Sequence, residues 1–159
     1  LTAAGVGGFL GAILAPRIGA RLGAGRAILL GRALVVVPWL ALALLPLTAS
    51  VSLVVLLLVL GAAQFLYGLA MGIEDANDTG YRQAVAPDAI QGRLNSTIRT
   101  VNRVVFFFGA LLAGVLATFV GYAFALGIGA AIFAVAALVV LLSPLRTARH
   151  DDPPDPAAA

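Results

Sequence analysis

Residues 104–142 read VVFFFGALLAGVLATFVGYAFALGIGAAIFAVAALVVLL and contain no charged side chain. A helix that crosses the hydrocarbon core of a bilayer needs roughly 20 predominantly apolar residues. The stretch is therefore too long for one span and long enough for two. Gly121 divides it near its middle, because glycine readily adopts backbone conformations that end a helix. We predict two membrane helices here, over 104–120 and 122–142.

Three more apolar runs lie upstream, over residues 1–14, 27–45 and 51–73. Only 11% of the 159 residues are charged and 62% are hydrophobic, whereas about a quarter of the residues of a soluble domain are charged. Backbone groups in hydrocarbon must be paired internally, and Leu53 to Leu60 lacks the alternation of a barrel strand. We therefore predict an all-α integral membrane protein with a five-helix bundle over residues 1–145.

The ten basic residues are all Arg, and they follow the alternation of the predicted spans. They fall in or near the connections 15–26 and 74–103 and in the tail after residue 145, whereas the connections around Thr48 and Gly121 carry no charge. Positive charge marks the cytoplasmic side of membrane proteins. We predict that both basic loops and a disordered tail over 146–159 are cytoplasmic. The pI near 10.2 therefore reflects membrane topology, and we expect no nucleic-acid partner.

The connection 74–103 contains a second pattern in its latter half. Apolar residues recur there at helical spacing on one face, at Leu94, Ile98, Val101 and Val105. Pro87 and Asp88 suit the first turn of a helix, where a proline breaks no hydrogen bond and an acid faces the positive end of the dipole. We predict an amphipathic helix that leads into the fourth span.

Polar side chains interrupt the third span on one helical face. Gln64, Tyr67, Gly68 and Met71 stand at positions i, i+3, i+4 and i+7, which share a face. One interpretation is a substrate cavity with polar groups for an amphipathic molecule. The other is interhelical packing, with Gln64 bonded to a neighbouring helix.

Charged and small residues near the span ends have structural interpretations. Glu74, Asp75 and Asp78 are expected to pair with Arg82, Arg93 or Arg99 at the membrane edge; the alternative is proton transfer. Arg32 and Arg103 lie close enough to helix ends to extend into the headgroup region. Glycines and alanines that offer close helix approach are Gly5, Gly8, Gly11, Gly109 and Ala113. No cofactor or metal site is predicted, and no catalytic residue.

Two loops and the C-terminus resemble a known family. Arg82-Gln83, Pro87, Gly92-Arg93-Leu94-Asn95-Ser96 and Arg99 resemble the loop before the eleventh helix of major facilitator superfamily transporters. The resemblance is to the drug:proton antiporter branch, which includes macrolide and siderophore exporters. The first loop is similar in Gly11, Ala15-Pro16-Arg17, Arg21, Gly23 and Arg26, and so is Ser143-Pro144-Leu145-Arg146. The chain departs from the superfamily at Ala15, where the general motif carries an acid.

The resemblance implies helices eight to twelve of twelve, part of one half-bundle. Seven N-terminal helices of the same protein would then be a partner of this chain. It also implies a cytoplasmic gate, whose candidate residues are Arg17, Arg21, Asp78, Arg82, Gly92, Arg93, Asn95 and Arg99.

On these grounds the sequence predicts part of a secondary transporter, not an enzyme. It would export small amphipathic molecules through a bacterial plasma membrane by alternating access, as a multidrug efflux antiporter does. Two alternatives stay open: a membrane subunit or scaffold without transport activity, and a membrane-embedded enzyme. The lipid bilayer and a small-molecule substrate are the other expected partners.

Overall fold

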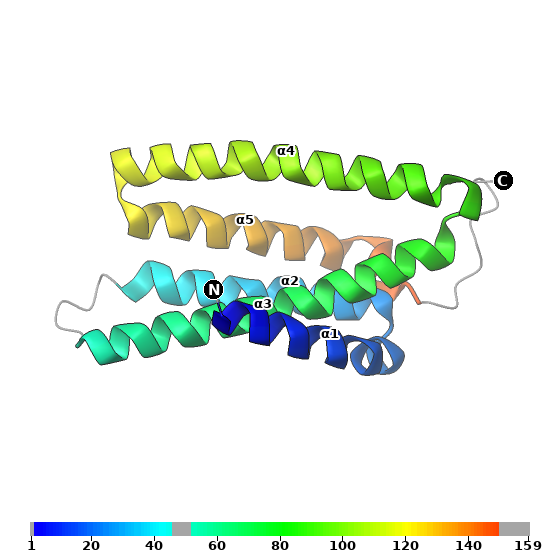
Figure 1. Ribbon diagram of the computed structural model, residues 1–159, viewed down its shortest axis with the longest axis horizontal. Coiled ribbons are helices and arrows are strands. Elements are labelled where there is room, and N and C mark those ends of the chain that lie inside the picture. Colours follow the sequence, from blue (N-terminus) through cyan, green and yellow to red (C-terminus); the bar gives the residue numbers. More distant parts are fainter. Residues whose placement is uncertain (1, 46–51, 150–159) are drawn as a thin grey trace.

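Five α-helices and one short 3-10 helix make up the secondary structure of the chain (Figure 1). The computed structural model describes residues 2–45 and 52–149, and these residues contain no β-strand. The elements are α1 (Thr2–Leu22), α2 (Ala24–Leu44), α3 (Leu53–Val85), α4 (Asp88–Val120), α5 (Tyr122–Leu142) and the 3-10 helix η2 (Pro144–Thr147). All five α-helices are long and apolar enough to cross a membrane, which confirms the predicted all-α membrane fold.

Successive helices run in opposite directions, so that their connections alternate between the two ends of the bundle (Figure 1). Helix α1 packs on α3, α3 packs on α2, α2 packs on α5, and α5 packs on α4. The α1–α2 junction, the α3–α4 junction and η2 all lie at the right-hand end in Figure 1. The basic connections therefore meet at one end of the fold.

Specific residues end these helices. Gly23 and Gly121 have φ angles of +85° and +89°, a backbone region that favours glycine, and they separate α1 from α2 and α4 from α5. The predicted break at Gly121 is confirmed. Helix α3 ends before Ala86 because a residue that precedes proline is forced out of the helical region; Ala86 is extended and Pro87 follows. Helix α4 then begins at Asp88, as predicted.

Helices α3 and α4 contain 33 residues each, against 21 in each of the other three. At 1.5 Å per residue they are about 50 Å long, well beyond the roughly 30 Å hydrocarbon core. The prediction of loops over 15–26 and 74–103 is wrong for the secondary structure: only Gly23 and Ala86–Pro87 lie outside helices there. Polar residues do not stop a helix that continues into water, and the only breaker in the longer segment is Pro87. The membrane boundaries themselves stay predictions.

The contact between α1 and α3 is a seam of small residues. Helix α1 buries every fourth residue, at Gly7, Gly11, Ala15 and Gly19. A Cβ atom on Gly7 or Gly11 would collide with the backbone of α3, at Phe65 O and Leu69 O respectively. From the other side, Gly68 and Gly72 meet the backbone of α1 at Ala4 and Gly8. The two helices are thus in backbone contact along this seam.

The predicted glycine contacts were only partly right. Gly11 lies in the seam as expected, and Gly8 lies at its edge with Gly68 O 3.6 Å from a Cβ position. Gly5 and Gly109 have no atom within 4 Å of a Cβ position, so they make no close helix approach within the described part of the chain. The closest contacts instead use Gly7, whose role the sequence did not single out.

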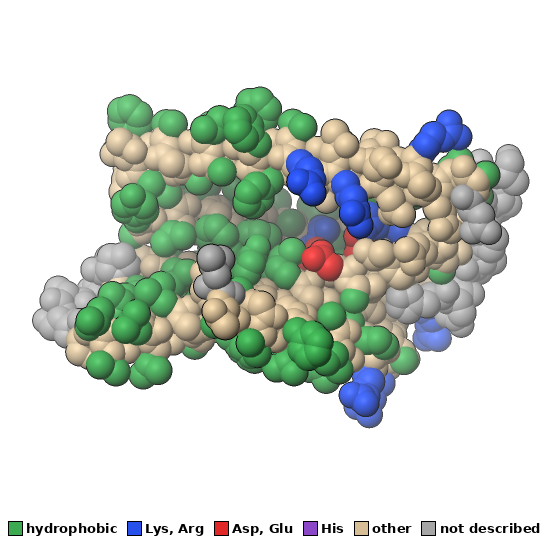
Figure 2. Space-filling model, viewed as in Figure 1, with side chains coloured by type: hydrophobic (Ala, Val, Ile, Leu, Met, Phe, Trp, Pro, Cys, Tyr) green, Lys and Arg blue, Asp and Glu red, His purple; other side chains and the backbone are tan. Residues whose placement is uncertain are grey.

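Larger side chains join α2 to α5. Trp39 lies over Gly129, where a Cβ would come within 2.7 Å of the indole ring, and its ring centroid is 5.6 Å from that of Phe133. Helix α4 contributes no buried residue and packs mainly against α5. Its large apolar side chains, such as Phe106 and Phe119, point outward, as Figure 2 shows along the upper edge of the molecule.

The segment after α5 packs against the start of α2. The Gly25 N–H donates to Ala148 O at 3.1 Å, and Ala148 is buried. Leu145 O lies so close to Gly25 that a Cβ would not fit there. The prediction of a disordered tail from residue 146 is therefore wrong for residues 146–149, since η2 and Ala148 hold them against α2. Residues 150–159 lie outside the described part of the chain.

Candidate functional site

The polar stripe of α3 borders two hollows. Gln64 and Tyr67 line a cavity of about 180 Å³ between α2, α3 and α5, together with Pro38, Trp39 and Leu126. The ring of Trp39 and the amide of Gln64 give this cavity both an apolar wall and a hydrogen-bonding group. A drug-sized ligand needs roughly 300–1,000 Å³, so this cavity has room for part of such a molecule.

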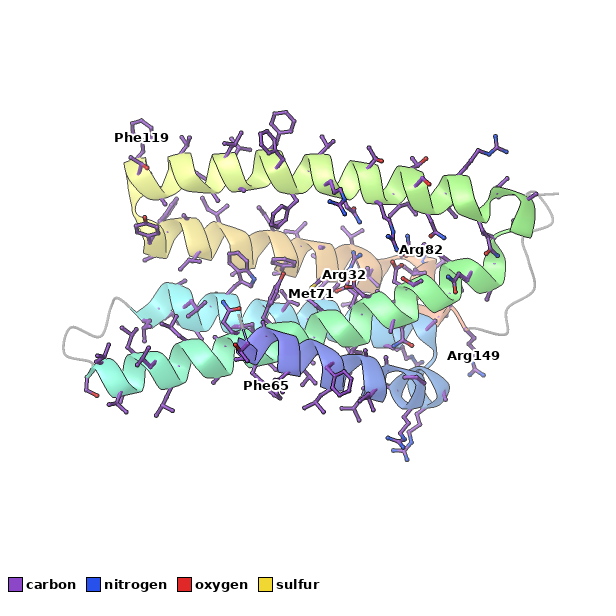
Figure 3. All side chains as sticks on the ribbon, viewed as in Figure 1. Arg32, Phe65, Met71, Arg82, Phe119 and Arg149 are labelled. Carbon is purple, nitrogen blue, oxygen red and sulfur yellow. The ribbon has the colours of Figure 1, made fainter. Side chains whose placement is uncertain are left out.

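The second hollow is a groove of about 670 Å³ along α1 and α3. Tyr67, Gly68 and Met71 line it from α3, and Asp75 and Gln83 extend it toward the end of that helix. Gly68 is itself buried against the Ala4 backbone, so its contribution to the groove is close helix packing. Tyr67 borders both hollows. Figure 3 labels Met71 near the middle of α3.

An ion pair joins α2 to α3 close to these hollows. Arg32 Nε lies 2.7 Å from Glu74 Oε1, with the Arg32 and Glu74 side chains 34% and 12% exposed. Gly31 precedes Arg32 and lies against the Glu74 Cβ, where any larger side chain would collide. Figure 3 labels Arg32 in the centre of the bundle. The prediction that Arg32 extends to the headgroups, with Glu74 paired to Arg82, Arg93 or Arg99, is therefore wrong.

The signal for this pair was present in the sequence but ambiguous. Arg32 is the only charged residue of the run 27–45, and a charge inside an apolar helix needs a partner. Glu74 is 42 residues away, and any arginine near a helix end was an equally good partner by sequence. Only the packing of α2 on α3 selects between them.

The second ion pair is local to α3. Arg82 Nη2 lies 2.9 Å from Asp78 Oδ2, one helical turn away. Arg82 also donates from Nε to Asp78 O at 3.3 Å and from Nη2 to Thr79 Oγ1 at 3.4 Å. The predicted pairing of Asp78 with Arg82 is confirmed. It joins two residues of one helix and does not connect α3 to a neighbour.

The remaining gate candidates on α4 are accessible. Arg93 and Arg99 are exposed, Asn95 is half-exposed, and Gly92 has no atom within 4 Å of a Cβ position. Neither arginine lies within 4.0 Å of a described carboxylate. Arg99 and Arg103 line a hollow of about 580 Å³ with Phe106. In Figure 2, arginine side chains on α4 lie across a gap from acidic side chains on α3.

Arg17 and Arg21 lie in the last turns of α1 and are exposed. Behind them, the buried Asn77 of α3 donates from Nδ2 to Ala15 O at 3.2 Å and to Ile73 O at 2.8 Å. Asn77 was not among the predicted site residues, yet it is the only polar residue of the described chain that is fully buried. Its amide reaches the backbone at position 15, where the superfamily motif has an acid.

Comparisons with known proteins follow from this geometry. The sequence model of one protein family, described as "Transmembrane secretion effector", matches residues 1–157. No curated protein and no solved structure matches the chain. Among the described residues, no three His, Cys, Asp or Glu side chains gather as metal ligands.

Proposed function

The chain belongs to the transmembrane secretion effector family, a family of major facilitator superfamily transporters, and from this premise we propose that it exports small amphipathic molecules. The export is secondary active transport by alternating access, in the manner of a multidrug antiporter of the macrolide and siderophore exporter branch. In such folds the substrate site lies between two halves of the protein near the bilayer midplane. The seven N-terminal helices of the same protein would supply the other half.

The observation that carries this proposal is the position of Gln64. It is an amide in the middle of an apolar helix, and it borders a cavity walled by Trp39 and Tyr67. An uncharged hydrogen-bonding group with aromatic neighbours suits molecules that are apolar with a few polar atoms. Met71 extends the surface toward α1, and methionine adapts to ligands of different shape.

The charged residues at the other end of α3 and α4 would control access. Asp75 and Asp78 on α3 are acidic, and Arg93 and Arg99 on α4 are basic. A pair between the two helices biases the conformational equilibrium only if it forms in one state and not in the other. We assign Arg17, Arg21, Arg82, Gly92 and Asn95 to the same cytoplasmic gate, in which Gly92 allows close approach to α4.

A flux measurement tests the cavity assignment. With the whole protein in proteoliposomes, we expect saturable, gradient-driven transport of amphipathic dyes. Gln64→Leu should raise the KM by about three- to tenfold for dyes with a hydrogen-bonding group, because one hydrogen bond contributes about 0.5–1.5 kcal/mol. Dyes that lack such a group should be transported with an unchanged KM.

Thr118→Val is the matched control for this experiment. Thr118 is an exposed residue of α4 whose hydroxyl donates to Gly114 O in its own helix at 2.9 Å, so its loss removes a polar group from a membrane helix away from the cavity. An equal rise of the KM in both variants would contradict a role for Gln64 in binding. An absence of flux with the unchanged protein would favour a scaffold, and turnover of a lipid substrate would favour a membrane enzyme.

The proposed orientation places the basic end of the bundle in the cytoplasm of a bacterium, with the C-terminus on the same side. Single cysteines at Thr48 or Ser50, which lie outside the described residues, are expected to react with an impermeant thiol reagent from outside the cell. Cysteines at Thr97 on α4 and Thr147 on η2 should react only after the membrane is opened. Labelling of the Thr97→Cys variant in intact cells would reverse the orientation.

A further inference from the structure

A basic cavity lies at the junction of α1 and α2. Its volume is about 670 Å³. Arg21 at the end of α1, Arg26 at the start of α2 and Arg149 after η2 all line it, and no carboxylate does so in the described part of the chain. The polar stripe of α3 and its hollows do not include this cavity, so the proposed transport leaves it unexplained.

The fold holds the three arginines in place from separate elements. Gly23 turns the chain between α1 and α2 with φ +85°, which brings Arg21 and Arg26 to the same opening. The bond from Gly25 N to Ala148 O fixes the segment that carries Arg149, and the Arg149 side chain reaches within 3.6 Å of a Cβ position on Gly23. Figure 3 shows Arg149 beside this end of the bundle.

The backbone adds to the positive potential of the cavity. Gly23 is the N-cap of α2, a helix of 21 residues, and no described side chain caps its first turn. The N-terminus of a helix carries a partial positive charge and favours bound anions. Three guanidinium groups with planar donors also match the oxygens of a phosphate, which arginine binds in bidentate fashion.

The location of the cavity points to the source of that anion. It surrounds a turn between two apolar helices of about 32 Å each, which matches the thickness of the hydrocarbon core. Such a turn lies at the level of the lipid headgroups. Basic pockets between membrane helices bind the headgroups of anionic lipids there. The geometry points to a phosphate-binding site at the α1–α2 junction that takes the headgroup phosphate of an anionic membrane lipid.

Lipid titration of the purified whole protein tests this site. Native mass spectrometry with phosphatidylglycerol should give a saturable first binding step, weakened at least tenfold by Arg21→Gln/Arg26→Gln, because each arginine at a membrane surface contributes about a factor of five to lipid binding. Both side chains are exposed, so their loss does not open the core. The single variant Arg149→Gln, outside the helices, should weaken binding about threefold to fivefold.

Arg17→Gln/Arg146→Gln is the matched control, because it removes two exposed charges from the same end without touching the cavity. Equal weakening by both double variants, or by neither, overturns the proposal. A parallel calorimetric titration with inorganic phosphate separates the two sources of the anion. If inorganic phosphate alone depends on Arg21 and Arg26, the site binds free phosphate; if neither probe does, no phosphate site exists at this junction.

Discussion

Glu74→Gln is expected to destabilise the folded protein by about 3 kcal/mol, because it leaves the Arg32 charge between two helices without its partner. The pair is 2.7 Å long, and the Glu74 side chain is only 12% exposed. Removal of one member of a buried pair typically costs about 3–5 kcal/mol. The value at the low end is appropriate here, since Arg32 is 34% exposed and can turn toward water.

The measurement is an unfolding titration with SDS in mixed micelles, followed by far-UV circular dichroism. Arg32→Met in the Glu74→Gln background should recover most of the lost stability, because an uncharged pair leaves no isolated charge. Asp78→Asn is the matched control: it breaks an ion pair within one helix, which contributes only about 0.3–0.5 kcal/mol. If Asp78→Asn were as destabilising as Glu74→Gln, the interhelical pair would have no special weight. A changed transport rate in the stable Asp78→Asn protein would support its assignment to the gate.

Gly11→Leu should have a comparable or larger effect, because it inserts a side chain into a contact made by backbone atoms. A Cβ at position 11 would collide with Leu69 O and would lie 3.1 Å from both Gly72 Cα and Ile73 N. Overpacking of a tight core costs about 1–3 kcal/mol. We expect about 3 kcal/mol or more, since backbone cannot swing aside as a side chain does.

Gly5→Leu is the control for this change. It introduces the same side chain on the same helix, at a position with no atom within 4 Å of its Cβ. Both variants lose the same helix-destabilising glycine, so the difference between them isolates the α1–α3 contact. Thermal unfolding in detergent, read by size-exclusion chromatography, should show a lower midpoint for Gly11→Leu alone. Equal midpoints would mean that α1 and α3 do not depend on the seam.

The sequence was sufficient for the number of helices and for two of their boundaries. Apolar length predicted five spans, and the properties of Gly121 and Pro87 placed the end of one helix and the start of another. The faces of the helices could not be predicted in the same way, because a helix that is apolar on all sides has no polar face to distinguish its buried side from its lipid side. Gly5, Gly7, Gly8 and Gly11 are therefore indistinguishable by pattern, and only Gly7 and Gly11 meet α3 directly.

The candidate site was predicted to the same extent. Helical spacing correctly placed Gln64, Tyr67 and Met71 along one side of α3, and those residues do border hollows. It did not predict that Gly68, between them, is the point where α1 crosses, which separates the groove from the cavity. The partner of Glu74 was also beyond reach, because the sequence does not specify that α2 lies against α3.

The glycine seam also constrains how this protein can change over generations. Every substitution at Gly7, Gly11, Gly68 or Gly72 adds atoms where the backbones already touch, so drift at these positions has no permissive direction. The outer face of α4 is the opposite case, because Phe106 and Phe119 contact little of the protein and other apolar residues can replace them. Mutational tolerance in this chain should therefore follow backbone proximity and not hydrophobicity: the smallest residues will be the least replaceable and the largest the most.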